Sequence, residues 1–332
     1  MTQQDKQALN SRKRGFLKKS LGLASGGALL GTLGAAASGN AFAQGAADTL
    51  RIGYQKYGNL VLLKARVTLE QRLAPLGVKV QWLEFPAGPQ LLEGLNAGAI
   101  DVGTVGETPP IFAQAAGVDF VYIGNEPLAP RGEAIVVPKD SPIKTLADLR
   151  GKKIALNRGS NVHFLLVRAL QKAGIQYSEI QSIYLTPSDA RAAFTQGSID
   201  AWVIWDPFFS AIQTQAGARI LEDGTGLVNN LQFYLAARRF AESQPKLLYA
   251  LLDELGKVDS WARDNENAVA QFLSPRIGID VATLDLAVKR AAFGVQPITA
   301  ATLAYQQQIA DVFSDLKLIP KPIKVTDATW KV

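Results

Sequence analysis

Cysteine is absent from the 332-residue chain, and His163 is its only histidine. The absence of cysteine excludes a disulfide framework, a thiolate metal site, a cysteine nucleophile and a lipid-modified N-terminal cysteine. One histidine without clustered carboxylates leaves too few ligands for an ordinary metal site, so we expect neither a metal nor another cofactor. His163 falls in the first turn of an apolar-faced helical segment, where we interpret it as a structural residue.

Familiar catalytic motifs are missing as well. The sequence contains no Gly-x-Ser-x-Gly elbow and no phosphate-binding loop. An acid–base pair of Asp or Glu residues stays open, because sequence spacing does not reveal which carboxylates meet in space. We therefore expect a binding protein, with an enzyme acting on a small anionic substrate as the alternative.

The first 43 residues follow the order of a secretory signal peptide. A basic stretch begins at Arg12, an uncharged run extends from Leu21 to Ala37, and Ala41-Phe42-Ala43 offers a small-x-small cleavage site. Lys13-Arg14 resembles the paired arginines of a twin-arginine signal, so twin-arginine export and general secretion are both open. A membrane anchor is the alternative for the apolar run, which is short and rich in glycine.

Excess charge is small once this leader is set aside. Residues 1–43 carry six of the 35 Lys and Arg residues and one of the 29 Asp and Glu residues, which leaves 29 basic against 28 acidic residues. The net charge of +6 therefore comes largely from the leader. A nucleic-acid partner loses its main support, and we expect an exported protein that binds no nucleic acid.

Strand-like and helix-like segments alternate along the rest of the chain. The strand-like segments are Leu50–Tyr54, Val78–Phe85 and Ile100–Val105, and helical apolar spacing runs over residues 60–73 and 90–96. This βαβαβ order predicts an α/β fold with a mainly parallel sheet. After Ala241, helical patterns dominate, over residues 245–262, 267–273, 281–293 and 299–316.

An internal echo predicts that the fold is divided into two similar lobes. The segment Leu95–Asp101 is repeated as Phe194–Asp200, 99 residues later, and Gly106–Pro110 aligns with Trp205–Phe209 at the same offset. Each lobe would carry its functional loops at the carboxyl ends of its strands. Two passages of the chain between the lobes would form a hinge that closes about a ligand.

The lobe boundaries follow from this echo and from a strand-like segment at Ala134–Val137. We predict that the second lobe starts just after this segment and that the chain returns to the first lobe near Leu231 to Ala237. The predicted domains are a signal peptide, residues 1–43, a lobe 1 of residues 48–137 and 235–332, and a lobe 2 of residues 138–234.

Two strand-to-helix junctions carry the most informative polar residues. Ser160 and Asn161 open a helix in the second lobe, and Thr108 with Pro109 opens one in the first lobe. A helix N-terminus presents free N–H groups and partial positive charge, which suits an oxyanion without any lysine. Two such ends facing each other would form a neutral anion clamp, whereas plain helix capping is the alternative.

Further ligand contacts are expected in the other loops at the strand ends. Gln55 follows the first strand, Gly88 the second, and Asp189 the corresponding strand of the second lobe. Trp205 would add a flat apolar wall, although a tryptophan at such a place is also a common core residue.

Two acidic residues, Glu107 and Asp206, lie in the same loops. A carboxylate is an unusual neighbour for a bare anion. Each could pair with Lys56 or Arg158, cap a helix, or bind an amine on the ligand.

At these junctions the chain resembles the periplasmic aliphatic-sulfonate-binding proteins, within the nitrate/sulfonate/taurine group of solute-binding proteins of ABC importers. The likeness runs from about Leu50 to Phe209 and more loosely through the helical C-terminus. The segments that carry it are Gly53–Lys56, Phe85–Pro89, Val105–Pro110, Pro187–Phe194 and Asp200–Pro207.

This resemblance implies a type II periplasmic-binding-protein fold, capture of an aliphatic sulfonate between two lobes, and delivery to a membrane permease as a sulfur source. It implies a periplasmic monomer without catalytic residues. The family's ligand loops match Gln55, Gly88, Thr108, Ser160, Asn161, Asp189 and Trp205 here.

The alternative ligands are taurine, a sulfate ester, nitrate and a thiamine-pathway pyrimidine. Some proteins of this fold are sulfinate-cleaving enzymes that use a cysteine, and this chain has none.

Overall fold

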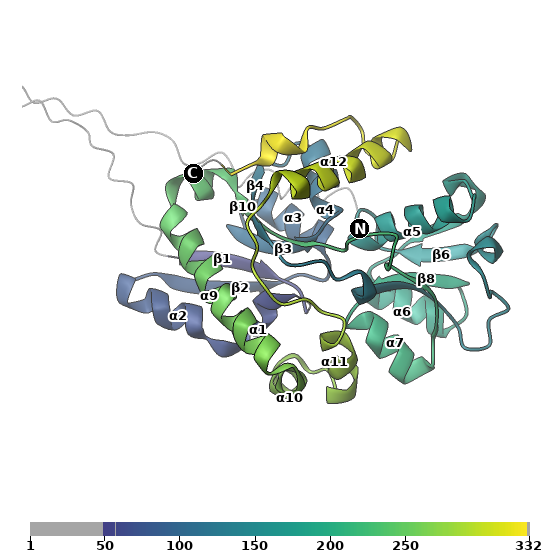
Figure 1. Ribbon diagram of the computed structural model, residues 1–332, viewed down its shortest axis with the longest axis horizontal. Helices are drawn as coiled ribbons and strands as arrows, with labels where there is room; N and C mark the ends of the chain where they lie inside the picture. Colours follow the sequence, from purple (N-terminus) through teal and green to yellow (C-terminus); the bar gives the residue numbers. More distant parts are fainter. Residues whose placement is uncertain (1–48, 57, 331–332) are drawn as a thin grey trace, which may run out of the picture. The chain divides into compact units, whose positions relative to one another are not determined.

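The computed structural model describes residues 49–56 and 58–330. The predicted signal peptide, residues 1–43, lies outside the described residues, as does Tyr57. The described chain alternates strands and helices around two separate five-stranded sheets (Figure 1). No helix in these two ranges is long and apolar enough to cross a bilayer.

The first sheet has the strand order β2-β1-β3-β10-β4. Strand β1 runs parallel to both β2 and β3, whereas β10 runs antiparallel to its neighbours β3 and β4. Its members are β1 (Thr49–Tyr54), β2 (Lys79–Glu84), β3 (Val102–Gly106), β4 (Phe120–Asn125) and β10 (Gln232–Ala237).

The second sheet repeats this arrangement, in the order β7-β6-β8-β5-β9. Strands β6, β7 and β8 take the places of β1, β2 and β3, and the antiparallel β5 takes the place of β10. Its members are β5 (Glu133–Val137), β6 (Lys153–Leu156), β7 (Gln181–Tyr184), β8 (Ala201–Trp205) and β9 (Arg219–Asp223). The predicted α/β fold with two similar halves is confirmed.

The sequence echo has a structural cause in both sheets. The Asp101 carboxylate accepts the backbone N–H of Arg51 at 2.9 Å, and the Asp200 carboxylate accepts that of Lys153 at 2.7 Å. The glycine three residues before each aspartate has a φ of +70°, a conformation that suits glycine at the end of a helix. The repeated aspartates therefore join β1 to the start of β3 and β6 to the start of β8.

The chain passes between the sheets twice, over residues 126–132 and 224–231. Strand β5 was expected in lobe 1, with lobe 2 starting at residue 138. Its ladders with β8 and β9 place it in the second sheet instead, so the first crossing comes one strand earlier than expected. Strand β10 likewise begins at Gln232, three residues before residue 235. Local sequence predicts a strand but not the sheet that it joins.

Helices cover both faces of the first sheet. Helices α1 and α9 pack against each other on one face, and α3 and α4 lie on the other. The single helix expected over residues 60–73 is broken at Val67, whose φ is +59°. The helices of this part are α1 (Asn59–Arg66), α2 (Thr68–Leu73), α3 (Gly88–Asn96), α4 (Pro109–Ala115), α8 (Arg238–Ser243) and α9 (Pro245–Asp264).

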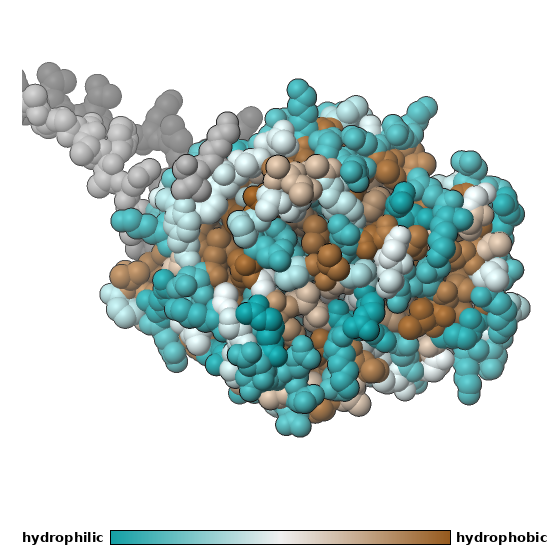
Figure 2. All heavy atoms as spheres, viewed as in Figure 1, coloured by the Kyte–Doolittle hydropathy of each residue, from teal (hydrophilic) through white to brown (hydrophobic). Residues whose placement is uncertain are grey.

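The second sheet carries α5 (Asn161–Lys172), α6 (Pro187–Thr195) and α7 (Phe208–Ala216). The remaining helices are α10 (Glu266–Ile277), α11 (Val281–Val288) and α12 (Ala300–Asp315). Helix α11 packs on both α10 and α7, so the C-terminal segment touches both halves of the fold. On the face shown in Figure 2, hydrophilic residues separate the apolar ones into several groups, as expected for helices whose other side faces a core.

Candidate functional site

The carboxyl ends of β3 and β6 lie against each other. A Cβ placed on Gly106, at the end of β3, would lie 2.8 Å from the Cβ of Asn161, the first residue of α5. A Cβ on Gly159 would lie 3.1 Å from the ring of Phe112 in α4. Glycine at both places allows this close approach, so the loop after β3 and the start of α5 face each other across the two sheets.

Helix α5 begins with an open N-terminus. Ser160 occupies the N-cap position, as predicted, yet its side chain caps no N–H group. Its hydroxyl instead donates to the carbonyl of Asn157 at 2.7 Å. Among the described residues, the N–H groups of Asn161 and Val162 have no hydrogen-bond partner. Two donors and the positive end of a twelve-residue helix are therefore available to an anion.

His163 holds the turn that precedes this helix end. Its Nδ1 accepts the N–H of Gly159 at 3.2 Å, and its Nε2 lies 2.9 Å from the hydroxyl of Tyr177. Burial lowers the pKa of His163 to about 3, with a further contribution from the charge of Arg158. The imidazole is therefore neutral at physiological pH, and its contacts fit the structural role expected from the sequence.

Thr108 lies two residues after Gly106, on the side of this contact that belongs to the first sheet. It occupies the N-cap of α4 with Pro109 as the first helical residue, as predicted. The side chain is fully buried, and its hydroxyl has no hydrogen-bond partner among the described residues. Buried hydroxyls are nearly always paired, so the hydrogen-bonding capacity of this one is left for a polar ligand atom or a water molecule.

The predicted clamp of two helix ends is asymmetric. Pro109 and Pro110 open α4, and proline has no N–H to donate. The N–H of Ile111 is already bonded to the carbonyl of Thr108 at 3.0 Å. The first half of the site therefore offers the hydroxyl of Thr108, and the second half supplies the helix end.

Gln55 and Gly88 are placed close to Thr108. The side-chain amide of Gln55 donates to the carbonyl of Thr104 in β3 at 3.1 Å. A Cβ on Gly88, the first residue of α3, would lie 2.8 Å from Cγ of Pro109. Both residues therefore surround the carboxyl end of β3, together with Thr108.

Three other predicted contacts have different partners in the structure. Asn161 donates its side-chain amide to the carboxyl of Glu133 and to Oδ1 of Asn230. Trp205 is 4% exposed and belongs to the apolar core. Asp189 is exposed and bonded to Thr186 at the start of α6, with no contact to the first half of the fold among its hydrogen bonds.

Asp206 and Glu107 are both buried and hydrogen-bonded within the protein. Asp206 accepts the N–H and the hydroxyl of Ser210, at 2.9 and 2.5 Å, and lies 3.5 Å from Arg290. Glu107 accepts the N–H of Leu231 at 2.8 Å and the hydroxyl of Tyr305 at 3.2 Å. Of the roles expected for these two carboxylates, Asp206 has that of a helix cap, at the start of α7. Neither carboxylate pairs with Lys56 or Arg158.

Sequence reasoning missed a second carboxyl beside Glu107. Glu133 is fully buried, and burial together with Glu107 raises its pKa well above the ordinary value. Burial also raises the pKa of Glu107 to about 7. These carboxyls lie between the chain crossings, where Asn230 also donates to the carbonyl of Ala129 at 2.8 Å. No local motif marks this group, because its members are far apart in the sequence.

Comparisons with known proteins cover most of the chain. The family model described as the NMT1-like family matches residues 44–274. The alkanesulfonate-binding protein of Xanthomonas axonopodis pv. citri, solved bound to MOPS, is 41% identical, with a TM-score of 0.83 over 86% of this chain and 99% of that chain.

Two proteins of Escherichia coli are also similar. Its periplasmic aliphatic sulphonate-binding protein is 45% identical, with a TM-score of 0.77 over 86% of this chain and 92% of that chain. The taurine-binding periplasmic protein of strain K12 is 28% identical over 204 residues, which are 58% of this chain and 62% of that protein. With two sheets of matching strand order and two crossings between them, the chain belongs to the NMT1-like family and has the periplasmic-binding-protein fold of these solved structures.

Proposed function

We propose that this protein captures an alkanesulfonate between its two lobes and delivers it to the membrane permease of an ABC importer. The observation that carries the proposal is the open N-terminus of α5, whose first residue lies against Gly106, two residues before Thr108. The hydroxyl of Thr108 has no hydrogen-bond partner in the described part of the chain. A sulfonate has one negative charge and three acceptor oxygens, so it can take two N–H donors and one hydroxyl at once.

Neutral donors suit this ligand because they leave no cation to neutralise when the site is empty. The basic side chains in the loops before α1 and α5 have other partners: Lys56 lies 3.8 Å from Glu84, and Arg158 lies over the ring of Tyr184 at 5.6 Å. The 41% identical relative supports the class of ligand, since MOPS is a propanesulfonate with a morpholine ring.

Taurine is the second candidate, and Asp206 bears on it. A carboxylate near the site could hold the ammonium group of taurine, but Asp206 already bonds Ser210 and pairs with Arg290. An ammonium would have to displace the guanidinium. This arrangement favours an alkanesulfonate without a second charge.

The proposed role also includes export, binding as a monomer and closure of the two lobes. The leader in residues 1–43 would direct the chain to the periplasm, where a monomer would bind one ligand and close about it through the two crossings. We propose no catalytic step: the carboxyls of Glu107, Glu133 and Asp206 each accept a hydrogen bond within the protein, and the ligand leaves unchanged.

Calorimetry with ethanesulfonate, butanesulfonate, taurine, sulfate and nitrate tests the proposal. We expect one-to-one binding of the two alkanesulfonates and weaker binding of the other anions. A thermal-shift series uses the same ligands together with a sulfate ester and a thiamine-pathway pyrimidine. It checks the order of affinities, because at equal concentration the ligand that binds the folded protein more tightly raises its melting temperature more. Failure of every sulfonate to bind would refute the ligand class, and an altered ligand in mass spectrometry would point to an enzyme.

A further inference from the structure

Two buried carboxyls lie beside the candidate anion site, one in each half of the fold. Glu107 directly precedes Thr108, and Glu133 of β5 accepts the side-chain amide of Asn161, the first residue of α5. Both side chains are fully buried. Glu107 and Glu133 are called the carboxyl pair below. An anion bound at the open end of α5 would have this pair as a close neighbour.

The carboxyl pair has hydrogen-bond partners but no counter-ion. Glu107 accepts the N–H of Leu231 at 2.8 Å and the hydroxyl of Tyr305 at 3.2 Å. One oxygen of Glu133, Oε1, is buried without any partner among the described residues. Neither carboxyl forms an ion pair in residues 49–56 and 58–330. A buried carboxylate without a cation is costly, so this geometry favours protonated, neutral acids.

The titratable groups on the surrounding elements do not neutralise the carboxyl pair. They are Tyr305 of α12, His163 of α5, Arg158 in the loop before α5, Asp206 after β8 and Arg131 of the first crossing. Burial raises the pKa of Tyr305 and lowers that of His163 to about 3, so both side chains are neutral. Both arginines have other partners, and Asp206 has its own cation in Arg290, at 3.5 Å.

Burial and mutual repulsion therefore hold protons on the carboxyl pair near neutral pH. Burial raises the pKa of Glu107 to about 7. Burial together with the charge of Glu107 raises the pKa of Glu133 well above its ordinary value. The empty site starts to lose a proton only as the pH rises through about 7.

A sulfonate at α5 would make ionisation of the carboxyl pair still less favourable. The N–H of Asn161 would bind the sulfonate while its side-chain amide binds Glu133, so two hydrogen bonds and one side chain set a separation of roughly 8 Å. At this separation and an effective dielectric of about 20, repulsion weakens binding to the ionised pair by roughly thirtyfold. The sulfonate binds the protonated pair more tightly, and the bound protein keeps its proton to higher pH by linkage.

We propose that the protein takes up a proton at the carboxyl pair when it captures a sulfonate, an inference that rests on the proposed function. The proton passes from the buffer to a carboxylate oxygen of the pair and returns when the sulfonate leaves. Affinity should be constant at acidic pH, where the empty site already carries the proton. It should fall as the pH rises above about 7 and level off roughly thirtyfold lower.

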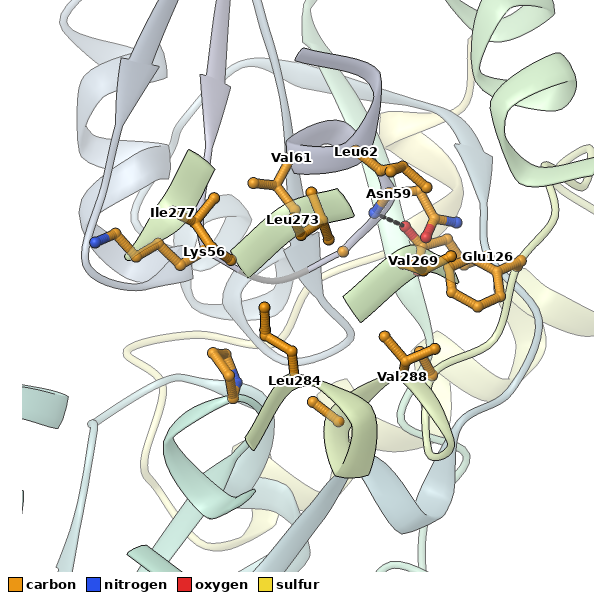
Figure 3. A pocket seen from close by; sticks show the side chains of 15 residues that line it. Lys56, Asn59, Val61, Leu62, Glu126, Val269, Leu273, Ile277, Leu284 and Val288 are labelled. Atoms are coloured by element: carbon orange, nitrogen blue, oxygen red, sulfur yellow. Dashed lines mark hydrogen bonds between the residues drawn. The ribbon is translucent and has the colours of Figure 1, made fainter. Parts of the chain in front are cut away.

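Glu126 is a buried carboxyl of the same kind at a different place, and it provides the comparison. Figure 3 shows it beside a pocket between α1, α10 and α11, with its hydrogen bond to the N–H of Asn59. Burial and the charge of Asp259 raise its pKa to about 8. Glu126 lies at the N-terminus of α1 and not at that of α5, so it tests whether any buried carboxyl gives the same effect.

Calorimetry with ethanesulfonate in buffers that differ in heat of ionisation counts the protons. Bicine, imidazole and Tris suit this measurement because they carry no sulfonate group, unlike the MOPS bound to the relative of Xanthomonas axonopodis. At pH 7.5 the wild-type protein should take up roughly half a proton per ligand, and at pH 5.5 about none. Affinities measured from pH 5.5 to 8.5 should show the corresponding fall.

The double variant Glu107→Gln/Glu133→Gln removes both titrating groups and keeps their size. It should bind ethanesulfonate without proton uptake and with an affinity that does not change with pH, whereas Glu126→Gln should take up the proton as the wild type does. Circular dichroism verifies that each variant is folded. Proton uptake that persists in the double variant, or that disappears in Glu126→Gln instead, would overturn the inference.

The wild-type protein alone also decides the question, should the double variant fail to fold. Binding of ethanesulfonate with no proton uptake and no pH dependence would refute this inference and leave the proposed function standing. No binding of any sulfonate at any of these pH values would refute the proposed function as well.

Discussion

Helices α1 and α5 occupy equivalent places in the two halves of the molecule, yet the N–H groups at their N-termini differ in whether a side chain accepts them. Helix α1 follows β1, and α5 follows β6, the strand that takes the place of β1 in the second sheet. Each helix comes after a glycine in the left-handed region, with φ of +81° at Gly58 and +72° at Gly159. At α1, the N–H of Asn59 is bonded to the carboxyl of Glu126 at 3.2 Å. At α5, no side chain of the described residues fills the corresponding position.

This difference shows where an anion can bind in a fold of two similar halves. A helix end whose N–H group is already bonded to a buried carboxyl has no free donor at that place for a ligand oxygen. The first half uses its helix end to stabilise its own structure, and the second half leaves its helix end free. The ligand site therefore cannot be symmetric, even though the two sheets have matching strand order.

Ser160→Asp would make α5 resemble α1 and should have the largest effect. The new carboxylate would take the N–H groups and face the sulfonate at about 4 Å, where repulsion is on the order of 4 kcal/mol at an effective dielectric of 20. We expect a loss of sulfonate affinity of roughly a thousandfold, measured by calorimetry. The folded state should be retained or stabilised, because aspartate is a good N-cap.

Ser160→Asn is the neutral control for this change, since it has a similar shape and hydrogen-bonding capacity without the charge. Its effect should be at least tenfold smaller. Equal losses in the two variants would contradict the electrostatic explanation, and unchanged affinity in Ser160→Asp would place the ligand elsewhere.

The sequence predicted the parts of this comparison that depend on local patterns. Strand and helix alternation indicated the α/β fold, and the repeated aspartates at Asp101 and Asp200 indicated two halves. N-cap positions at Thr108 and Ser160 were also found, because capping residues are preferred for reasons that act within one turn.

The parts that depend on distant contacts could not be predicted. Glu126 reaches the start of α1 from 67 residues away, and Arg290 reaches Asp206 from 84 residues away. The side-chain amide of Asn161 is bonded within the protein for the same reason, through Glu133 and Asn230. Such partners follow from the packing of the whole chain, and no sequence spacing marks them.

Glu126→Gln tests the carboxyl at the N-terminus of α1 through the pH dependence of protein stability. Burial and the charge of Asp259 raise the pKa of Glu126 to about 8, and Asp259, Asn59 and the hydroxyl of Tyr234 surround the carboxyl. The folded protein keeps this proton between pH 4.5 and 8 while the unfolded chain releases it. The free energy of unfolding should therefore fall as the pH rises through this window.

Urea unfolding at pH 5.5 and 7.5 measures the change. The wild-type protein should lose free energy of unfolding between these pH values, and Glu126→Gln should make this loss smaller by roughly 2 kcal/mol. The reason is that one proton corresponds to about 1.4 kcal/mol per pH unit. Part of the dependence should remain, since burial also raises the pKa of Asp259 to about 7. The exposed Glu93→Gln serves as control. An identical pH dependence in Glu126→Gln and wild type would contradict a buried protonated carboxyl.

Thr108→Val has the smallest expected effect and tests the part of the site that the first half of the fold supplies. Valine matches threonine in shape, so the change removes only a buried hydroxyl that has no partner among the described residues. Stability should be unchanged or slightly higher, whereas sulfonate affinity should fall roughly tenfold with the loss of a hydrogen bond to a charged group. Thr104→Val is the matched control, because its hydroxyl is also buried and unpartnered. A loss of sulfonate affinity in Thr104→Val with none in Thr108→Val would place the sulfonate farther along β3, beside Gly58.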